Sequence, residues 1–134
     1  MNTLKATMIV PIYQNDGRRQ PPEVFATLES RLLDDFGGFT KFPCEGNWLD
    51  EDGSWVEDMG VAYTITRMPC VLHPTEEGFV ARLMVIAKDT ASEAHQKCIY
   101  LDFVQAKAFL VEPWKGEAHA KGSTPAVGDA QPPT

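Results

Sequence analysis

Residues 36–67 constrain the fold most, because they read as a helix end that runs into a long two-stranded ribbon. Before the turn Asp50-Glu51-Asp52-Gly53, every second residue from Phe42 to Trp48 falls on one side of an extended chain, which predicts a strand over 40–49. Gly53 supplies the positive φ of a tight turn, and Gly60 is interpreted as a bulge. The return strand, over 55–66, is expected to place these residues on one face: Trp55, Met59, Val61, Tyr63 and Ile65. We expect the rest of the chain to cover this ribbon.

Two helices, one of them the helix that ends at residue 36, and at least two further strands are predicted around the ribbon. Alternating apolar residues predict a strand over 4–13, and Pro11 places its end at a sheet margin because proline cannot donate to a ladder. Apolar residues at spacings of three and four predict a helix over 22–36, closed by Gly37. Thr75 is the expected N-cap of a second helix over 75–95, although the apolar run 79–86 also permits a strand. Residues 98–112 are expected to form one last strand, or a strand pair that turns near Gln105.

This order of elements predicts an α+β fold of the ferredoxin-like, split β-α-β type. The antiparallel sheet of that fold carries both helices on one face and leaves the other face open. An apolar open face is usually hidden in a dimer, so we expect a homodimer. Candidates for the open face are Ile9, Trp48 or Trp55, Tyr63 and Phe109. The domain is expected to span residues 1–113, and residues 114–134 are expected to be disordered because they have few large apolar groups.

Composition argues against several kinds of partner and site. The formal net charge of the 134-residue chain is −7, which disfavours direct binding of nucleic acid because affinity for phosphate is built from Lys and Arg. No apolar run is long enough to predict a membrane span, and residues 1–5 lack the apolar block of a signal peptide, so we expect a cytoplasmic protein. Cys44, Cys70 and Cys98 lie in apolar segments and are expected to be reduced and buried.

Four short motifs occur in the order Asn15-Asp16-Gly17, Phe36-Gly37-Gly38, Gly46-Asn47-Trp48 and Asp52-Gly53. Over residues 8–112 this pattern resembles a group of small, uncharacterised bacterial and mobile-element proteins. Members of that group share an opening strand, a helix ending in Phe-Gly-Gly and a Gly-x-Trp strand before an acidic turn. The resemblance implies the same succession of elements. It implies no activity.

Acidic residues are concentrated on the ribbon, where no Lys or Arg lies between Lys41 and Arg67. Crowded carboxylates create a negative field that steers a basic partner, and tryptophan with a charged rim is typical of interface anchors. The first functional hypothesis is therefore a non-enzymatic domain that binds a protein with a basic surface, such as a host protein met by a phage- or plasmid-encoded chain. The predicted contact residues are Trp48, Asp50, Glu51, Asp52, Trp55, Glu57 and Asp58. A solvated hairpin tip explains the same residues without a partner.

Two metal-binding patterns are incomplete, and neither a metal nor a cofactor is expected. Asp50, Asp52, Ser54 and Glu57 resemble part of a calcium loop but depart from it in length, glycine position and terminal glutamate. Cys70 with His73 and His95 with Cys98 repeat one spacing, and the four together would make a zinc set. Structural zinc sites usually have tighter paired knuckles, so we interpret these residues as core thiols and surface imidazoles.

An enzyme is the less favoured class, because the chain carries no nucleophile elbow, phosphate loop or paired-carboxylate helix motif. Cys44 or Cys70 would serve as a nucleophile only if the fold brought a histidine within hydrogen-bond reach. The alternative hypothesis is a small-molecule-binding protein or small enzyme whose pocket lies between the sheet and a dimer mate. The polar groups expected in that pocket are Tyr63, His73, His95 and Tyr100.

Overall fold

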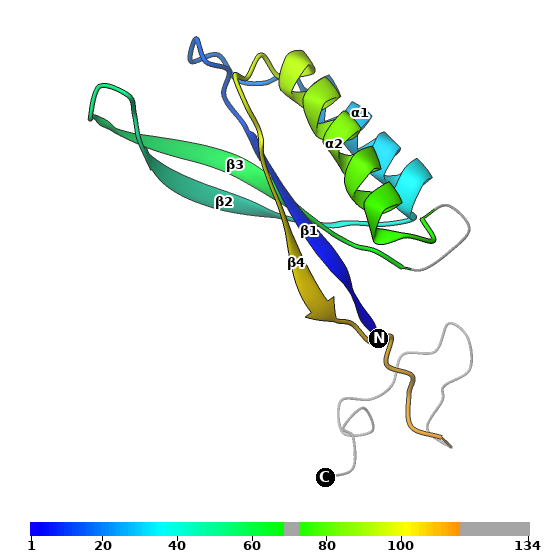
Figure 1. The fold of residues 1–134 in the computed structure, drawn as a ribbon. Coiled ribbons are helices and arrows are strands. Elements are labelled where there is room, and N and C mark those ends of the chain that lie inside the picture. The colour runs from blue at the N-terminus through cyan, green and yellow to red at the C-terminus, as the bar shows by residue number, and fades with distance from the viewer. Residues whose placement is uncertain (69–72, 116–134) are drawn as a thin grey trace, which may run out of the picture.

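A computed structural model describes residues 1–68 and 73–115 (Figure 1). Its elements follow the order β1 (Asn2–Pro11), α1 (Pro22–Phe36), β2 (Thr40–Leu49), β3 (Trp55–Thr66), α2 (Glu76–Glu93) and β4 (Tyr100–Lys107). The strands form one four-stranded antiparallel sheet in the order β2-β3-β1-β4. Both helices lie against the same face of this sheet (Figure 1). The chain therefore has the predicted ferredoxin-like α+β fold.

The register of the sheet sorts the strand residues into two faces. Met8 of β1 is paired with Tyr63 of β3, and both side chains are fully buried on the face that the helices cover. The neighbouring Ile9 is paired with Ala62 and Tyr100, and these residues belong to the open face. Side chains alternate between the faces of a strand, so the unbroken registers assign every strand residue to the helix face or to the open face.

The first helix begins and ends as the sequence predicts, and the second begins as predicted but ends at Glu93, two residues before the expected end. α1 has Pro22 in its first turn and closes at Gly37, which adopts a φ of 79° and donates its N–H to the carbonyl oxygen of Leu33 (2.9 Å). Thr75 caps α2, because its Oγ1 accepts the N–H of Gly78 at 3.1 Å. The alternative strand over 79–86 is wrong. Its apolar residues recur at helical spacing and place Phe79, Leu83 and Ile86 in the core between α2 and the sheet.

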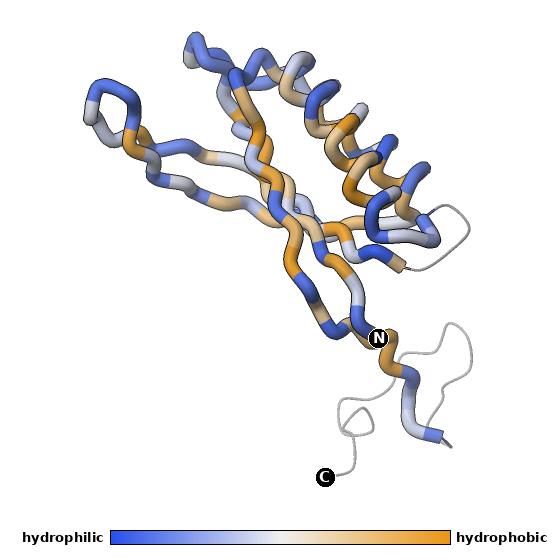
Figure 2. The backbone as a smooth tube through the Cα atoms, in the orientation of Figure 1, coloured by the Kyte–Doolittle hydropathy of each residue, from blue (hydrophilic) through white to orange (hydrophobic). Residues whose placement is uncertain are grey.

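The core lies between the helix layer and the sheet. It combines the inner stripes of α1 and α2 with alternate residues of β1 and β3, and partly buried residues of β4 complete it. Figure 2 shows the same arrangement, with hydrophobic segments along the strands and on the inner turns of the helices. The buried apolar residues are Leu4, Ala6, Met8, Val10, Val24, Leu28, Leu32, Tyr63, Ile65, Phe79, Leu83, Ile86, Ala87 and Ala94.

Gly60 lies in a regular part of the ribbon, opposite Pro11 and Cys44, so the predicted bulge is wrong. A Cβ atom at this position would lie 3.0 Å from the carbonyl oxygen of Val10 and 3.2 Å from Cγ2 of Ile9. Glycine is therefore required here by the close approach of β1.

The ends of the chain differ from the prediction in two places. The first strand begins at Asn2 and ends at Pro11, two residues earlier at each end than expected. The last strand is single, which was one of the two predicted alternatives, because Gln105 is paired with Leu4 inside the ladder. It spans Tyr100–Lys107 and is therefore shorter than the expected 98–112. The expected boundary between the domain and its tail, at 113/114, stays a prediction, and residues 116–134 lie outside the described part.

One residue predicted for the open face, Tyr63, lies elsewhere, and of the alternatives Trp48 and Trp55 it is Trp48 that lies on that face. Tyr63 belongs to the core, where its hydroxyl donates a 2.8 Å hydrogen bond to Glu29 of α1. Trp55 is paired with Leu49 on the helix side of the ribbon, opposite in face to Trp48. Ile9 and Trp48 do lie on the open face, and Phe109 follows the end of β4, where it is exposed.

The outer half of the β2–β3 hairpin extends beyond the helices (Figure 1). Its turn is closed by hydrogen bonds from the N–H of Asp50 to Ser54 (2.8 Å) and from the N–H of Gly53 to Asp50 (2.9 Å). Gly53 has the positive φ, 86°, that the turn requires. Figure 2 shows that the tip is hydrophilic, yet Trp55 beside it is 75% exposed. No helix of the described chain covers this half of the ribbon.

Candidate functional site: a pocket on the open sheet face

A pocket of about 690 Å³ opens at one end of the sheet, between the β2–β3 hairpin and the segment that leads from α2 into β4. Residues of β1, β2 and β3 form one side, and residues 96–101 form the other. The lining consists of Ile9, Pro11, Asn15, Cys44, Glu45, Gly46, Trp48, Asp58, Gly60, Gln96, Lys97, Cys98, Ile99, Tyr100 and Leu101. The pocket therefore joins parts of the chain that are far apart in sequence.

The indole of Trp48 lies flat across Gly46, two residues earlier on the same strand face. A Cβ atom at Gly46 would lie 2.9 Å from Nε1 of the indole and 3.0 Å from its Cε2 and Cζ2 atoms. Any side chain at position 46 would therefore displace the ring. The Gly-x-Trp motif thus places an aromatic surface, 45% exposed for the whole residue, in the wall of the pocket.

The hairpin side of the pocket is acidic. Asp58 is half-buried, and desolvation raises the pKa of its carboxyl group. Glu45 borders the same side, but it is paired with Met59, so its side chain belongs to the other face of the ribbon. Burial first and then the nearby Asp58 carboxylate raise the pKa of the Cys44 thiol. A thiol with a raised pKa is a weak nucleophile at neutral pH, so thiolate chemistry at Cys44 is disfavoured.

The opposite side is held in place by defined hydrogen bonds. Nε2 of Gln96 donates to the carbonyl oxygen of Tyr13 at 2.9 Å, which ties the α2–β4 segment to the β1–α1 loop. The buried Gln20 donates to the carbonyl oxygen of Ala94 at 2.7 Å. Between these two ties, His95 adopts a φ of 52°, in the left-handed region that few non-glycine residues occupy. The wall that carries Lys97 and Tyr100 is therefore well defined.

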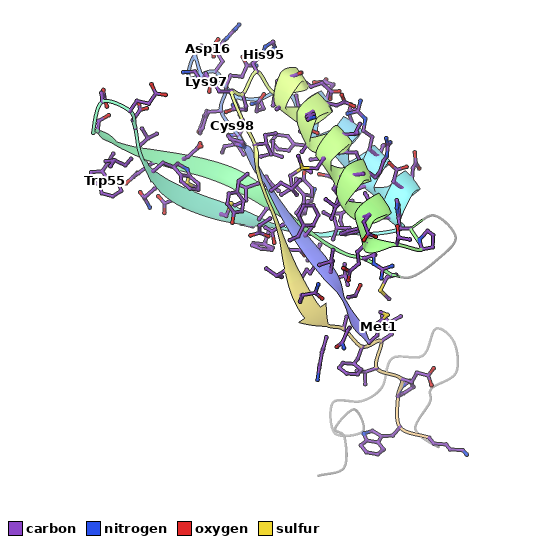
Figure 3. All side chains as sticks on the ribbon, viewed as in Figure 1. Met1, Asp16, Trp55, His95, Lys97 and Cys98 are labelled. Atoms are coloured by element: carbon purple, nitrogen blue, oxygen red, sulfur yellow. The ribbon has the colours of Figure 1, made fainter. Side chains whose placement is uncertain are left out.

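A smaller hollow of about 190 Å³ adjoins the pocket and shares Asn15 with it. It is lined by the turn residues Gln14, Asp16 and Arg18 together with His95. Arg18 donates from Nε to Asp16 at 2.8 Å, and the Asp16 pKa is lowered mainly by this side-chain hydrogen bond. Figure 3 shows Asp16, His95 and Lys97 gathered at this end of the molecule. The residues that line the hollow are all polar or charged, whereas the large pocket also has several apolar and aromatic residues in its wall.

The predicted hairpin residues fall into three groups. Trp48 and Asp58 line the pocket on the open face, whereas Trp55 and Glu57 are exposed on the other face. The tip carboxylates bind their own turn, since Asp52 accepts the N–H of Ser54 at 2.9 Å and its hydroxyl at 2.6 Å. Asp50 accepts the N–H of Glu51 at 2.8 Å. The structure therefore divides the predicted contact surface between two faces and a tip.

The four residues of the alternative pocket are not brought together. Tyr63 is buried under α1, and Tyr100 lies on the open face, where its hydroxyl donates to Asp102 at 2.8 Å. Nε2 of His73 lies 2.6 Å from the carbonyl oxygen of Asp35, and its ring stacks on Phe36 at the C-terminal end of α1. His95 lies just after the C-terminal end of α2, at the far end of the helix layer. Only Tyr100 lines the large pocket, and His95 lines the adjoining hollow.

The metal-binding patterns are not assembled in the described residues. Within 1–68 and 73–115, no three His, Cys, Asp or Glu side chains are placed to share a metal ion. His73 and His95 lie at opposite ends of the helices, so the zinc set of the sequence pattern is not brought together. Cys70 lies outside the described residues. Cys98 is exposed and Cys44 is half-buried, so the expectation of buried thiols is wrong for Cys98.

Several lining residues escaped prediction. Alternation along the predicted strands contained enough information to place Ile9, Cys44 and Asp58 on one face with Trp48, once the strand order was known. The wall formed by residues 96–101 has no such signal, because its position depends on where α2 ends.

No helix among the described residues has the length and apolar character needed to cross a membrane.

Comparison with solved structures identifies proteins that share the fold of this chain. No protein-family model and no curated protein sequence matches the chain. Among solved structures, a phage SAM lyase in complex with S-methyl-5′-thioadenosine is similar with a TM-score of 0.60 and 14% identity, over 82% of this chain and 93% of that chain. The periplasmic divalent cation tolerance protein CutA from Archaeoglobus fulgidus is similar with a TM-score of 0.53 and 13% identity, over 82% and 88%. The chain therefore shares the ferredoxin-like fold of these proteins over most of their length.

Proposed function

We propose that this chain binds S-adenosylmethionine or a related 5′-thioadenosine compound in the open-face pocket and acts on it as a small lyase. The observation that carries the proposal is the pairing, in one pocket, of aromatic rings from Trp48 and Tyr100 with the carboxylate of Asp58. The proposal belongs to the same class as the small-molecule alternative of the sequence analysis, but of the four residues expected there only Tyr100 lines this pocket. The phage SAM lyase, which shares the fold, suggests the ligand class.

The size and lining of the pocket suit a nucleoside. A volume of about 690 Å³ is within the range of roughly 300–1,000 Å³ that small-molecule sites occupy. The flat indole of Trp48 offers a stacking surface, and stacking of a base on an aromatic side chain contributes about 1–3 kcal/mol. Adenine therefore has a suitable surface in the pocket.

The acidic side of the pocket suits a sulfonium group. S-adenosylmethionine carries a fixed positive charge on sulfur, and this charge cannot be lost by deprotonation. A half-buried carboxylate such as Asp58 attracts it more strongly than an exposed one, because the local dielectric constant is lower. Binding of the cation also favours the ionised form of Asp58, whose pKa is raised in the free protein.

Cleavage of such a ligand needs no further reactant. When the bond between sulfur and the amino-acid γ-carbon breaks, sulfur keeps the electron pair and becomes the neutral thioether of S-methyl-5′-thioadenosine. The four-carbon fragment either loses a proton from its β-carbon to the solvent and forms a carbon–carbon double bond, or it forms a bond from its own carboxylate oxygen to the γ-carbon and closes a lactone. Neither route consumes water, an oxidant or a reductant. Loss of the positive charge beside Asp58 weakens the hold on the product and favours its release.

The test is incubation of the purified chain with S-adenosylmethionine, followed by chromatographic detection of S-methyl-5′-thioadenosine. We expect binding by calorimetry and formation of the thioether, with both reduced at least about tenfold in Asp58→Asn because the charge–charge attraction is lost. Glu57→Gln removes a neighbouring carboxylate on the other face and is the matched control. Absence of both binding and product in the parent chain would reject the proposal.

A second candidate, a binding domain for a basic protein, is favoured by the projecting hairpin. Trp55 is 75% exposed and Leu49 is 63% exposed, beside a tip that carries Asp50, Glu51 and Asp52. An exposed tryptophan with a charged rim has the composition of an interface anchor. The same surface leaves the pocket free, so the two functions are compatible.

Substitution of Asp50, Glu51 and Asp52 by alanine tests this second candidate. Affinity capture from host lysate with the parent chain identifies the partner. The triple variant is expected to bind that partner more weakly and with a smaller dependence on salt, because steering by rim charges is screened by ions. Unchanged affinity and salt dependence would remove the hairpin tip from the interface.

A further inference from the structure

The two sides of the pocket carry opposite charge. Asp58 lies on the hairpin side, and Lys97 lies on the side formed by the α2–β4 segment. A pocket with one charge sign selects cations or anions, whereas opposite signs on facing sides select a molecule that carries both. The arrangement therefore points to a zwitterion.

Lys97 is held on a fixed stretch of backbone. Its neighbour Gln96 donates its backbone N–H to Ala91 at 2.9 Å and its side-chain amide to Tyr13 at 2.9 Å. The preceding His95 completes the turn in the left-handed conformation. The backbone that presents the ammonium group is thus ordered before a ligand binds, which lowers the entropic cost of recognition.

Arg18 contributes less charge than its proximity suggests. Its guanidinium forms a 2.7 Å ion pair with Asp16, so these two charges in the lining of the adjoining hollow offset each other. Asn15 connects that hollow to the pocket and offers an amide. Lys97 is therefore the cationic lining residue of the large pocket that is best placed to receive an anionic group.

We infer that the pocket is specific for the amino-acid part of its ligand, with the α-carboxylate bound by Lys97 near Asn15 and the cationic groups directed toward Asp58. This inference rests on the proposed function and adds that the ligand must carry a free carboxylate. A 5′-thioadenosine compound without the amino-acid tail uses only the aromatic part of the site. Lys97 is a specificity residue that contacts the carboxylate of the ligand.

The test compares two neutral thioethers by calorimetry: S-adenosylhomocysteine, which has the amino-acid tail, and S-methyl-5′-thioadenosine, which lacks it. We expect the parent chain to bind S-adenosylhomocysteine more tightly. Lys97→Ala is expected to weaken the affinity for S-adenosylhomocysteine about tenfold, because a hydrogen bond between charged groups is lost. The affinity for S-methyl-5′-thioadenosine is expected to change less than about twofold. Lys97→Arg keeps the charge and is expected to restore most of the difference.

Lys107→Ala, at the opposite end of β4, is the matched lysine control and is expected to leave both affinities unchanged. Equal affinity of the parent chain for the two compounds, or equal weakening of both by Lys97→Ala, would overturn the role of Lys97 while the proposed function stands. Failure of the parent chain to bind either compound would overturn the proposed function and this inference with it. Circular dichroism of each variant verifies that the fold is kept.

Discussion

The missing side chain of Gly46 determines where the Trp48 ring lies. In Gly46→Ala the new methyl group would meet the indole at about the 2.9–3.0 Å found for an ideal Cβ, so the ring must swing away. Because the ring is at the end of a flexible side chain, and alanine favours the strand over glycine by roughly 0.5–1 kcal/mol, we expect the free energy of unfolding to change little. Binding of S-methyl-5′-thioadenosine is expected to weaken several-fold, through lost stacking.

The fluorescence of Trp48 reports this change directly in a Trp55→Phe, Trp114→Phe background. A shift of the emission maximum in Gly46→Ala is expected. Gly38→Ala is the matched control, because a Cβ atom added at Gly38 would have no heavy atom within 4 Å. The same emission spectrum in both variants would show that the indole does not lie across Gly46.

Because of Tyr63, the free energy of unfolding is expected to fall at alkaline pH. Burial first, and then the hydrogen bond and charge of Glu29, raise the pKa of its phenol well above the ordinary value of 10.0. In the unfolded chain the phenol ionises near pH 10, whereas in the folded chain it stays neutral. The contribution to stability is therefore complete below pH 10 and is lost as the pH rises further.

Urea unfolding between pH 8 and pH 11 measures this effect. The parent chain is expected to lose stability above pH 10, and Tyr63→Phe is expected to lose less over the same range, after an initial cost of about 1 kcal/mol for the missing hydrogen bond. Tyr13→Phe, at an exposed tyrosine, is expected to keep the parent slope. Parallel slopes for the parent chain and Tyr63→Phe would contradict the burial of this hydroxyl.

The role of a residue was predicted correctly where it depends on the residue's own turn or cap, and wrongly where it depends on a neighbouring strand or helix. Gly37, Gly53 and Thr75 act through their own turn or cap, and all three have the predicted role. Gly60 was interpreted as a bulge because nothing in its own segment reveals the Val10 carbonyl of β1. Tyr63 was placed on the wrong face for the same reason: its face depends on which side of the sheet the helices pack.

At the scale of elements, the start of α2 depends on one side-chain hydrogen bond. Thr75→Ala removes the Oγ1 acceptor for the N–H of Gly78, which lies 3.1 Å away. Loss of an N-cap of this kind costs about 1 kcal/mol. We expect a corresponding fall in the midpoint of thermal unfolding, measured by circular dichroism, and near-complete retention in Thr75→Ser. An unchanged midpoint in Thr75→Ala would show that α2 begins without this cap.

The elements themselves were largely predictable, since each has a period that its own residues display. The residues of α1 and α2 that pack on the sheet are the apolar residues spaced three and four apart in the sequence. The residues of β2 and β3 that share a face are those that alternate in the sequence. The pocket was not predictable at this scale. It exists because the short segment after α2 crosses toward β4 opposite the hairpin, and no period in residues 96–101 indicates that position.

At the scale of the whole molecule, the open face leaves much apolar surface uncovered. Phe42 is 46% exposed and Val104 is 50% exposed, and both lie on this face. Exposed apolar patches of this kind usually mark an interface. We expect the chain to sediment as an oligomer above its monomer mass of 14.9 kDa, and Phe42→Asp with Val104→Asp to shift it toward the monomer.

Leu33→Asp is the matched control for that experiment, because Leu33 is an equally exposed apolar residue on α1, away from the open face. It is expected to leave the sedimentation unchanged. A parent chain that sediments as a monomer at all concentrations would refute the open face as a contact between copies.

The β2–β3 ribbon extends beyond the helices that cover it, so substitutions in its two halves are subject to different constraints. Its inner half packs on the core, so substitutions there are filtered by folding. Its outer half, with Leu49 and Trp55, packs on nothing else in the described chain, so folding tolerates many replacements there. In a survival screen of all single variants, any intolerance at those two positions would reveal an encounter with another molecule, because the fold itself places no demand on them.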